Sequence, residues 1–115
     1  MTRITILKNS DGSIVEYEIN GHTGFGAYGE DILCASISIL SQTALISLNE
    51  VCGIKENDIS YLIDDKKGYL KVSLPLRLPR EQREKADIVL MTMELGLKGL
   101  IDIYPDYVTL KYREV

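Results

Sequence analysis

Hydrophobic and polar side chains alternate in two short segments at the start of the chain. Residues 3–8 and 13–19 each place apolar side chains at every second position, the pattern of a strand with one buried face. The segment between them contains Asp11 and Gly12, and glycine readily adopts the positive φ that a tight turn requires. We therefore predict an antiparallel hairpin.

After Asp31 the apolar positions recur every three or four residues, which predicts a helix ending near Gly53. Its apolar side chains lie on almost every side: Leu33, Ile37, Leu40, Ala44, Leu48 and Val51 in one stripe, with Ile32, Ile39 and Ile46 beside it. Such a helix must be covered on more than one side, by the sheet and by a second subunit. Because residues 32–49 also contain several serine and asparagine side chains, we predict a buried helix and no membrane span.

Alternation returns in the middle of the chain. Residues 59–63 and 70–74 flank a polar turn at residues 64–68, which predicts a second hairpin. Pro75 and Pro79 then interrupt the chain before the next element.

The last third of the chain predicts a helix and a strand. Residues 80–98 carry one apolar stripe opposite charged side chains, the pattern of an amphipathic helix, with Gly99 near its end. Residues 107–112 resume the alternation of a strand. The order is therefore ββαββαβ, and we predict an α+β fold in which a mixed or antiparallel sheet packs with two helices.

Length and charge narrow the class of protein. A chain of 115 residues, 45% of them hydrophobic, is the size of one domain, so we expect residues 1–115 to form a single domain. The net charge of −4, with lysine and arginine scattered along the chain, argues against direct nucleic-acid binding. The N-terminal segment has no secretory signal, and we expect a cytoplasmic protein.

Candidate chemistry lies between the second strand and the first helix. His22, the single histidine, follows the strand directly. If Asp31 caps the helix, Cys34 lies in its first turn, where unpaired N–H groups and the helix dipole favour a thiolate. A cysteine activated by an imidazole is a nucleophile for acyl transfer, and the same N–H groups would stabilise an oxyanion.

On spacing alone, less active roles are more common for both residues. A cysteine on a helix is usually a small core residue, and a histidine after a strand is often only a loop donor. Cys52 is about 27 Å from Cys34 along a continuous helix, too far for a disulfide, and we expect it to be passive. One histidine and two distant cysteines cannot form a zinc site, so we expect no metal and no other cofactor.

Residues 24–29 match the spacing G-x-G-x-x-G, but a dinucleotide fingerprint needs a parallel βαβ unit, which the predicted hairpin does not provide. We interpret the segment as a lid between base and nucleophile. Its glycines allow movement and its aromatic side chains cover the apolar side chains of a peptide. The lid residues are Gly24, Phe25, Gly26, Tyr28 and Gly29.

The residues around the pair resemble the signature of the ribosomal-processing cysteine protease (Prp) family. The resemblance is densest in Gly21-His22-Thr23 and in residues 29–38, which read Gly-Glu-Asp-Ile-Leu-Cys-Ala-Ser-Ile-Ser, and it extends over nearly the whole chain. Thr23, Leu33 and Ser36 depart from the family pattern but keep its small or apolar character. In the family, the residues that match His22 and Cys34 form the catalytic dyad.

The resemblance implies a homodimeric cysteine endopeptidase that removes the N-terminal extension of a large-subunit ribosomal protein. Asp31 also matches the family, and either orients the imidazole or caps the helix. Ser38, one turn beyond Cys34, is expected near the site as a packing hydroxyl. The rival hypotheses are a non-catalytic ribosome-associated or peptide-binding module with an inert Cys34, and a thiol redox sensor.

Overall fold

The computed structural model describes residues 1–27 and 31–115, and its elements follow the predicted order. The elements are β1 (Thr2–Lys8), β2 (Ile14–Asn20), α1 (Ile32–Glu50), the short 3-10 helix η1 (Glu56–Asp58), β3 (Ser60–Asp64), β4 (Tyr69–Ser73), α2 (Arg80–Ile103) and β5 (Val108–Glu114). Both hairpins, both long helices and the last strand lie within a few residues of their predicted positions. The α+β fold is confirmed.

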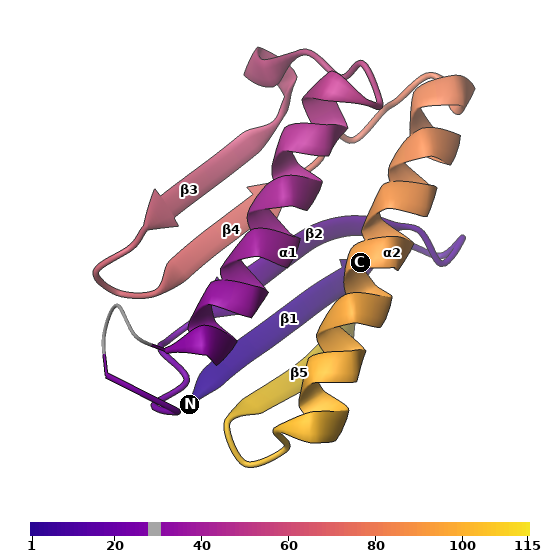
Figure 1. Ribbon diagram of the computed structural model, residues 1–115. Coiled ribbons are helices and arrows are strands. Elements are labelled where there is room, and N and C mark those ends of the chain that lie inside the picture. Colours follow the sequence, from indigo (N-terminus) through magenta and orange to yellow (C-terminus); the bar gives the residue numbers. More distant parts are fainter. Residues whose placement is uncertain (28–30) are drawn as a thin grey trace.

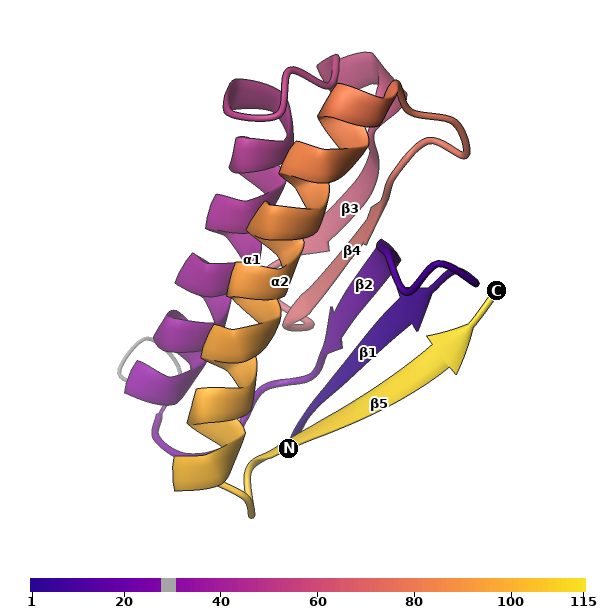
Figure 2. The ribbon, with the colours of Figure 1, turned by 90° about the vertical axis from the view of Figure 1, so that its right-hand side faces the viewer.

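Five strands form one mixed sheet in the order β3-β4-β2-β1-β5. The two hairpins join through antiparallel pairing of β2 with β4, which places Asn20 opposite Tyr69. The last strand lies parallel to β1, because α2 carries the chain back along the sheet before β5 begins (Figure 1). Both helices lie on one side of the sheet (Figure 2). The opposite face carries polar side chains that include Glu16, Glu18 and Lys71.

The core lies between this sheet and the two helices. Each strand contributes alternate side chains, and each helix contributes one stripe at steps of three and four. The buried apolar side chains include Ile4, Ile6, Tyr17, Ile19, Leu70, Val72 and Val108 from the strands, and Leu33, Ile37, Ala44, Leu48, Ala86, Leu90, Met93 and Leu97 from the helices.

The helix α1 packs on the sheet and on α2 and leaves a further side exposed. On that side Ile32, Ile39 and Ile46 remain 62%, 66% and 61% exposed, and their cover by a second subunit stays a prediction. The helix α1 is long and apolar enough to cross a membrane, a property that it shares with core helices of soluble proteins. In the structure it packs against the sheet and α2.

The helix α2 continues past its predicted end at Lys98 to Ile103. Gly99 lies inside it, because a glycine within a helix costs only about 1 kcal/mol relative to alanine and tertiary packing offsets that cost. Gly96 faces α1, and a Cβ there would lie 2.9 Å from Leu40 Cδ2. The missing side chain therefore allows the two helices to approach closely.

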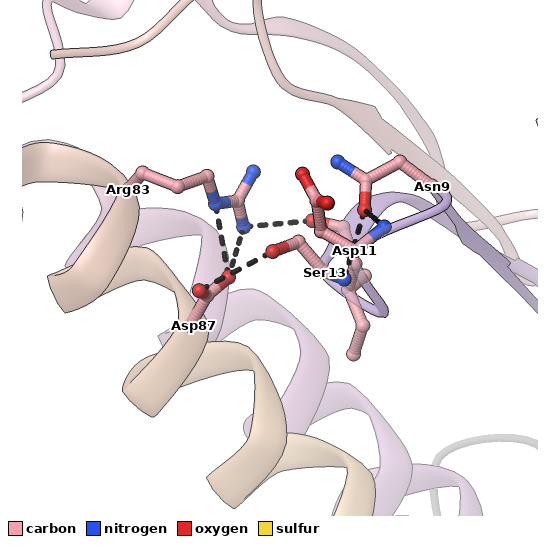
Figure 3. A network of polar contacts seen from close by, with 6 residues as sticks. Asn9, Asp11, Ser13, Arg83 and Asp87 are labelled. Atoms are coloured by element: carbon pink, nitrogen blue, oxygen red, sulfur yellow. Dashed lines mark hydrogen bonds and ion pairs between the residues drawn. The ribbon is translucent and has the colours of Figure 1, made fainter. Parts of the chain in front are cut away.

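A polar network joins the turn between β1 and β2 to the start of α2 (Figure 3). Arg83 donates to the carbonyl oxygen of Ile14 at 2.9 Å and forms an ion pair with Asp87 at 2.8 Å. The hydroxyl of Ser13 donates to Asp87 at 3.3 Å, and the Asn9 side chain accepts from two backbone N–H groups of the turn. These contacts attach the start of α2 to the β1–β2 turn. This turn lies at one end of the sheet, and the last residue of β2 lies at the other.

We predict that Tyr17→Phe lowers the free energy of unfolding by about 1–2 kcal/mol. Tyr17 is fully buried, its hydroxyl donates to Ser41 O at 2.8 Å, and burial raises its pKa far above the ordinary value of 10. Urea denaturation measures the change. In the control Tyr61→Phe, a residue that is 45% exposed loses the hydrogen bond from its hydroxyl to Glu56, and we expect a change within about 0.5 kcal/mol. Equal effects of the two substitutions would contradict this account of the core.

Candidate active site

The first turn of α1, the end of β2 and the turn between β3 and β4 lie close together, near the N-terminus in Figure 1. Residues from these segments line a cleft of about 520 Å³. His22 and Cys34 both line it, together with Asp31 and Ser38. The imidazole and thiol side chains come from half-buried residues, so the cleft shelters them while leaving them open to a ligand. The structure thus brings the predicted pair to one cavity.

His22 is positioned by the turn between β3 and β4. The N–H of Gly21 donates to Gly68 O at 3.0 Å, which ties the end of β2 to that turn. His22 Nε2 lies 2.9 Å from the carbonyl oxygen of Lys66. Because a carbonyl only accepts, Nε2 donates, and Nδ1 is the acceptor nitrogen of the neutral ring. Gly68 has a φ of 62°, and a Cβ there would lie 3.1 Å from Nδ1, so this position favours glycine.

Asp31 caps the N-terminus of α1. Its Oδ1 accepts hydrogen bonds from the backbone N–H groups of Leu33 at 3.0 Å and Cys34 at 2.9 Å. Its Oδ2 accepts from the Thr23 hydroxyl at 2.5 Å and from the N–H of Gly26 at 3.1 Å. Of the two roles considered for Asp31, the two bonds from Leu33 and Cys34 support the capping role.

The Asp31 side chain is ionised although the residue is only 7% exposed. Burial opposes ionisation, but the hydrogen bonds from Thr23, Cys34 and Gly26 outweigh it and lower the pKa from 3.8 to about 2. A fixed negative charge therefore lies beside the first turn of the helix at neutral pH.

The sulfur of Cys34 is held by Thr23. The backbone N–H of Thr23 donates to Sγ at 3.3 Å, and the Thr23 hydroxyl oxygen lies 3.4 Å from Sγ. Thr23 is 2% exposed and Cys34 is half-buried, so both contacts are partly buried. Since Thr23 directly follows His22, the same backbone segment carries the imidazole and holds the thiol.

One expectation about the helix terminus is wrong. The N–H groups of Leu33 and Cys34 donate to the Asp31 side chain, and that of Ala35 donates to the Asp31 carbonyl at 3.1 Å. They are therefore not available to stabilise an oxyanion, because the capping residue has already satisfied them. The N–H donor to the sulfur comes from Thr23, outside the helix.

Phe25 lies differently from the expectation for a lid. Its ring packs edge-on against Tyr104 at 5.1 Å and Tyr107 at 5.3 Å, between the end of α2 and the start of β5. These contacts attach the segment after Thr23 to the β5 edge of the sheet, which is the edge opposite to β3. Contact of Phe25 with a bound peptide stays a prediction.

The other predicted residues are distributed as follows. Gly24 and Gly26 line the cleft, whereas Tyr28 and Gly29 lie outside the described residues. Ser38 lines the cleft one turn beyond the thiol and is exposed, so it is not the packing hydroxyl that we expected.

Sequence reasoning missed the contributions of Thr23, Lys66 and Gly68. The turn that carries Lys66 and Gly68 was predicted, but its place beside His22 follows from the pairing of β2 with β4, which the alternation of residues does not specify. Across residues 1–27 and 31–115, no group of three or more histidine, cysteine or acidic side chains could hold a metal ion.

Known proteins resemble the chain over its whole length. Residues 1–109 match the family model described as cysteine protease Prp. The ribosomal processing cysteine protease Prp of Staphylococcus aureus is 28% identical over 98% of this chain and 100% of its own length. The crystal structure of SMU.848 from Streptococcus mutans has a TM-score of 0.83 and 28% identity, covering 100% of this chain and 96% of its own.

A further similar structure is the essential ribosomal processing protease Prp of S. aureus in complex with a substrate peptide. Its TM-score is 0.80 at 21% identity, and the match covers 98% of this chain and 100% of that one. At this identity the likeness shows a shared fold.

We predict that Asp31→Asn lowers the free energy of unfolding at pH 7 by about 1–2 kcal/mol, because the amide cannot accept all four hydrogen bonds. The folded pKa, about 2, lies below the ordinary value of 3.8, so ionised Asp31 stabilises the fold above pH 4. That contribution is lost as the pH falls through about 2.

Wild type should therefore lose more stability than Asp31→Asn between pH 4 and pH 2, as measured by denaturant unfolding at each pH. Asp102→Asn, which removes an exposed carboxylate from α2, is the charge-matched control. Its loss of stability between pH 4 and pH 2 should equal that of wild type. Parallel curves for wild type and Asp31→Asn would contradict the assignment.

Proposed function

This chain belongs to the cysteine protease Prp family, and we propose that Cys34 is its nucleophile and His22 its general base. The observation that supports these roles is that both side chains line one open cleft, where Thr23 holds the sulfur and Lys66 holds the imidazole. As a member of the family, the protein is a cysteine protease.

In the proposed reaction, the imidazole of His22 takes the proton from Cys34 Sγ through its acceptor nitrogen. The sulfur then attacks the carbonyl carbon of the scissile peptide bond and forms a tetrahedral intermediate. The C–N bond breaks as His22 returns the proton to the leaving amine. His22 then takes a proton from a water molecule as its oxygen attacks the thioester carbonyl, the C–S bond breaks to release the second product as a carboxylic acid, and the proton on His22 returns to Cys34 Sγ.

The substrate that we propose is the N-terminal extension of a large-subunit ribosomal protein precursor in the cytoplasm. The curated relative is named for ribosomal processing, and the similar S. aureus enzyme was solved with a substrate peptide. The cleft is open to solvent and is lined by Gly24 and Gly26, which carry no side chains to obstruct an extended peptide segment.

We also propose that the protein is a homodimer that covers the exposed side of α1. Ile32, Ile39 and Ile46 recur every seven residues and form one apolar ridge. An apolar groove between α1 and α2, lined by Ile39, Leu40 and Ile88 among others, adjoins it. A continuous apolar surface of this kind is typical of a protein interface.

We expect wild type to shorten an N-terminally extended ribosomal protein of the same cell at one bond, with the products weighed by mass spectrometry. Cys34→Ser and His22→Ala should each reduce the rate at least about 1000-fold, because either substitution removes a reacting group. Cys52→Ser, at the end of α1, is the matched control and should retain activity.

A peptide-binding module would bind the precursor and leave it intact. Cleavage by Cys34→Ser would instead assign the activity to another residue or to a contaminant. Reaction of Cys34 with iodoacetamide, measured from pH 5 to 9, separates an activated thiol from an inert one, since only the former depends on His22.

The dimer is tested by Ile39→Glu combined with Ile46→Glu. Light scattering should give twice the chain mass for wild type and the chain mass for this variant, since each charge would be buried without a partner. Leu62→Glu places the same charge on β3, at a residue as exposed as Ile46, and should leave the dimer intact. A monomeric wild type would reject this part of the proposal.

A further inference from the structure

The hydroxyl of Thr23 has three polar neighbours and a fixed capacity for hydrogen bonds. It lies 2.5 Å from Asp31 Oδ2, receives the N–H of Phe25 at 3.2 Å and lies 3.4 Å from Cys34 Sγ. A hydroxyl has one hydrogen to donate and two lone pairs that accept. The hydroxyl can therefore form three hydrogen bonds, one as donor and two as acceptor, which is one for each of its three neighbours.

The roles of the three neighbours follow from their chemistry. Ionised Asp31 can only accept, so it takes the one hydroxyl hydrogen, and a backbone N–H such as that of Phe25 can only donate. The remaining lone pair faces Sγ. A lone pair attracts an S–H group and repels a thiolate, so this contact favours the protonated sulfur.

We infer that Thr23 is a positioning residue that favours Cys34 as a thiol in the absence of substrate, because it donates its hydroxyl hydrogen to Asp31 and turns an oxygen lone pair toward Sγ. This inference rests on the proposed role of Cys34 as nucleophile. Thr23 would then act on the protonation of Cys34, whereas a threonine that only packs in the core would not.

Other groups around the cleft act on the same sulfur. The Asp31 carboxylate also accepts from the Cys34 side chain and disfavours a second negative charge beside it, whereas His22 and the backbone N–H of Thr23 favour the thiolate. Asp65, in the turn between β3 and β4, and Tyr69, the first residue of β4, line the same cleft. The contribution of the hydroxyl is therefore measured by removing it alone.

The isosteric substitution Thr23→Val removes the hydroxyl and keeps the backbone N–H contact. Alkylation of Cys34 by iodoacetamide is followed from pH 5 to 9 by mass spectrometry of the Cys34 peptide, with buried Cys52 as internal reference. We expect the midpoint of the profile to move down by about half a unit to one unit, which is about a three- to tenfold faster reaction at a pH below both midpoints. Thr23→Ser retains the hydroxyl and should restore the wild-type midpoint.

An unchanged midpoint, or one that moves up, would overturn the inference, since the hydroxyl would then be neutral toward the sulfur or donate to the thiolate. If Thr23→Val exposes Cys52 and so reveals unfolding, Thr23→Ala provides the same comparison with a smaller side chain. The assay needs no proteolysis. A lowered midpoint in a protein that cleaves no precursor would reject the proposed function and keep the role of Thr23.

Discussion

The Asp31 carboxylate joins three segments on which the candidate site depends. One oxygen fixes the first turn of α1, and the other fixes Thr23 and the backbone of Gly26. Four donors to a single buried anion compensate for the loss of water around it, so the charge is stable where an unpaired one would not be. The position of Cys34 is therefore set by the hydrogen bonds that keep Asp31 ionised.

Most of the fold could be predicted because its elements carry clear periodicities. The hairpin around Gly12, with its φ of 82°, and the stripes of both helices were recognisable from local sequence. The sheet order was not, because alternation shows that a strand has a buried face and does not show which strand lies beside it. The full length of α2 was also missed, since Gly99 is a weak stop signal within a well-packed helix.

The reacting groups of the candidate site were predicted from the sequence, but the contacts that hold them in place were not. His22 and Cys34 are distinctive as residue types, whereas the contacts that hold them come from backbone atoms of Lys66 and Thr23. Backbone donors and acceptors are the same at every residue, so only their arrangement in space distinguishes these two. The expected oxyanion donors at the start of α1 failed for a related reason, because capping and anion binding compete for the same N–H groups.

The hydrogen bond between His22 and Lys66 links the imidazole to the outermost hairpin of the sheet, formed by β3 and β4. The strand β3 pairs on one side only, and Tyr61, Leu62 and Ile63 on it are all exposed. Edge strands open locally at a lower free energy than the centre of a sheet. Because the core lies between the sheet and the two helices, a local opening of this hairpin would remove the hydrogen bond to His22 without requiring the core to unfold.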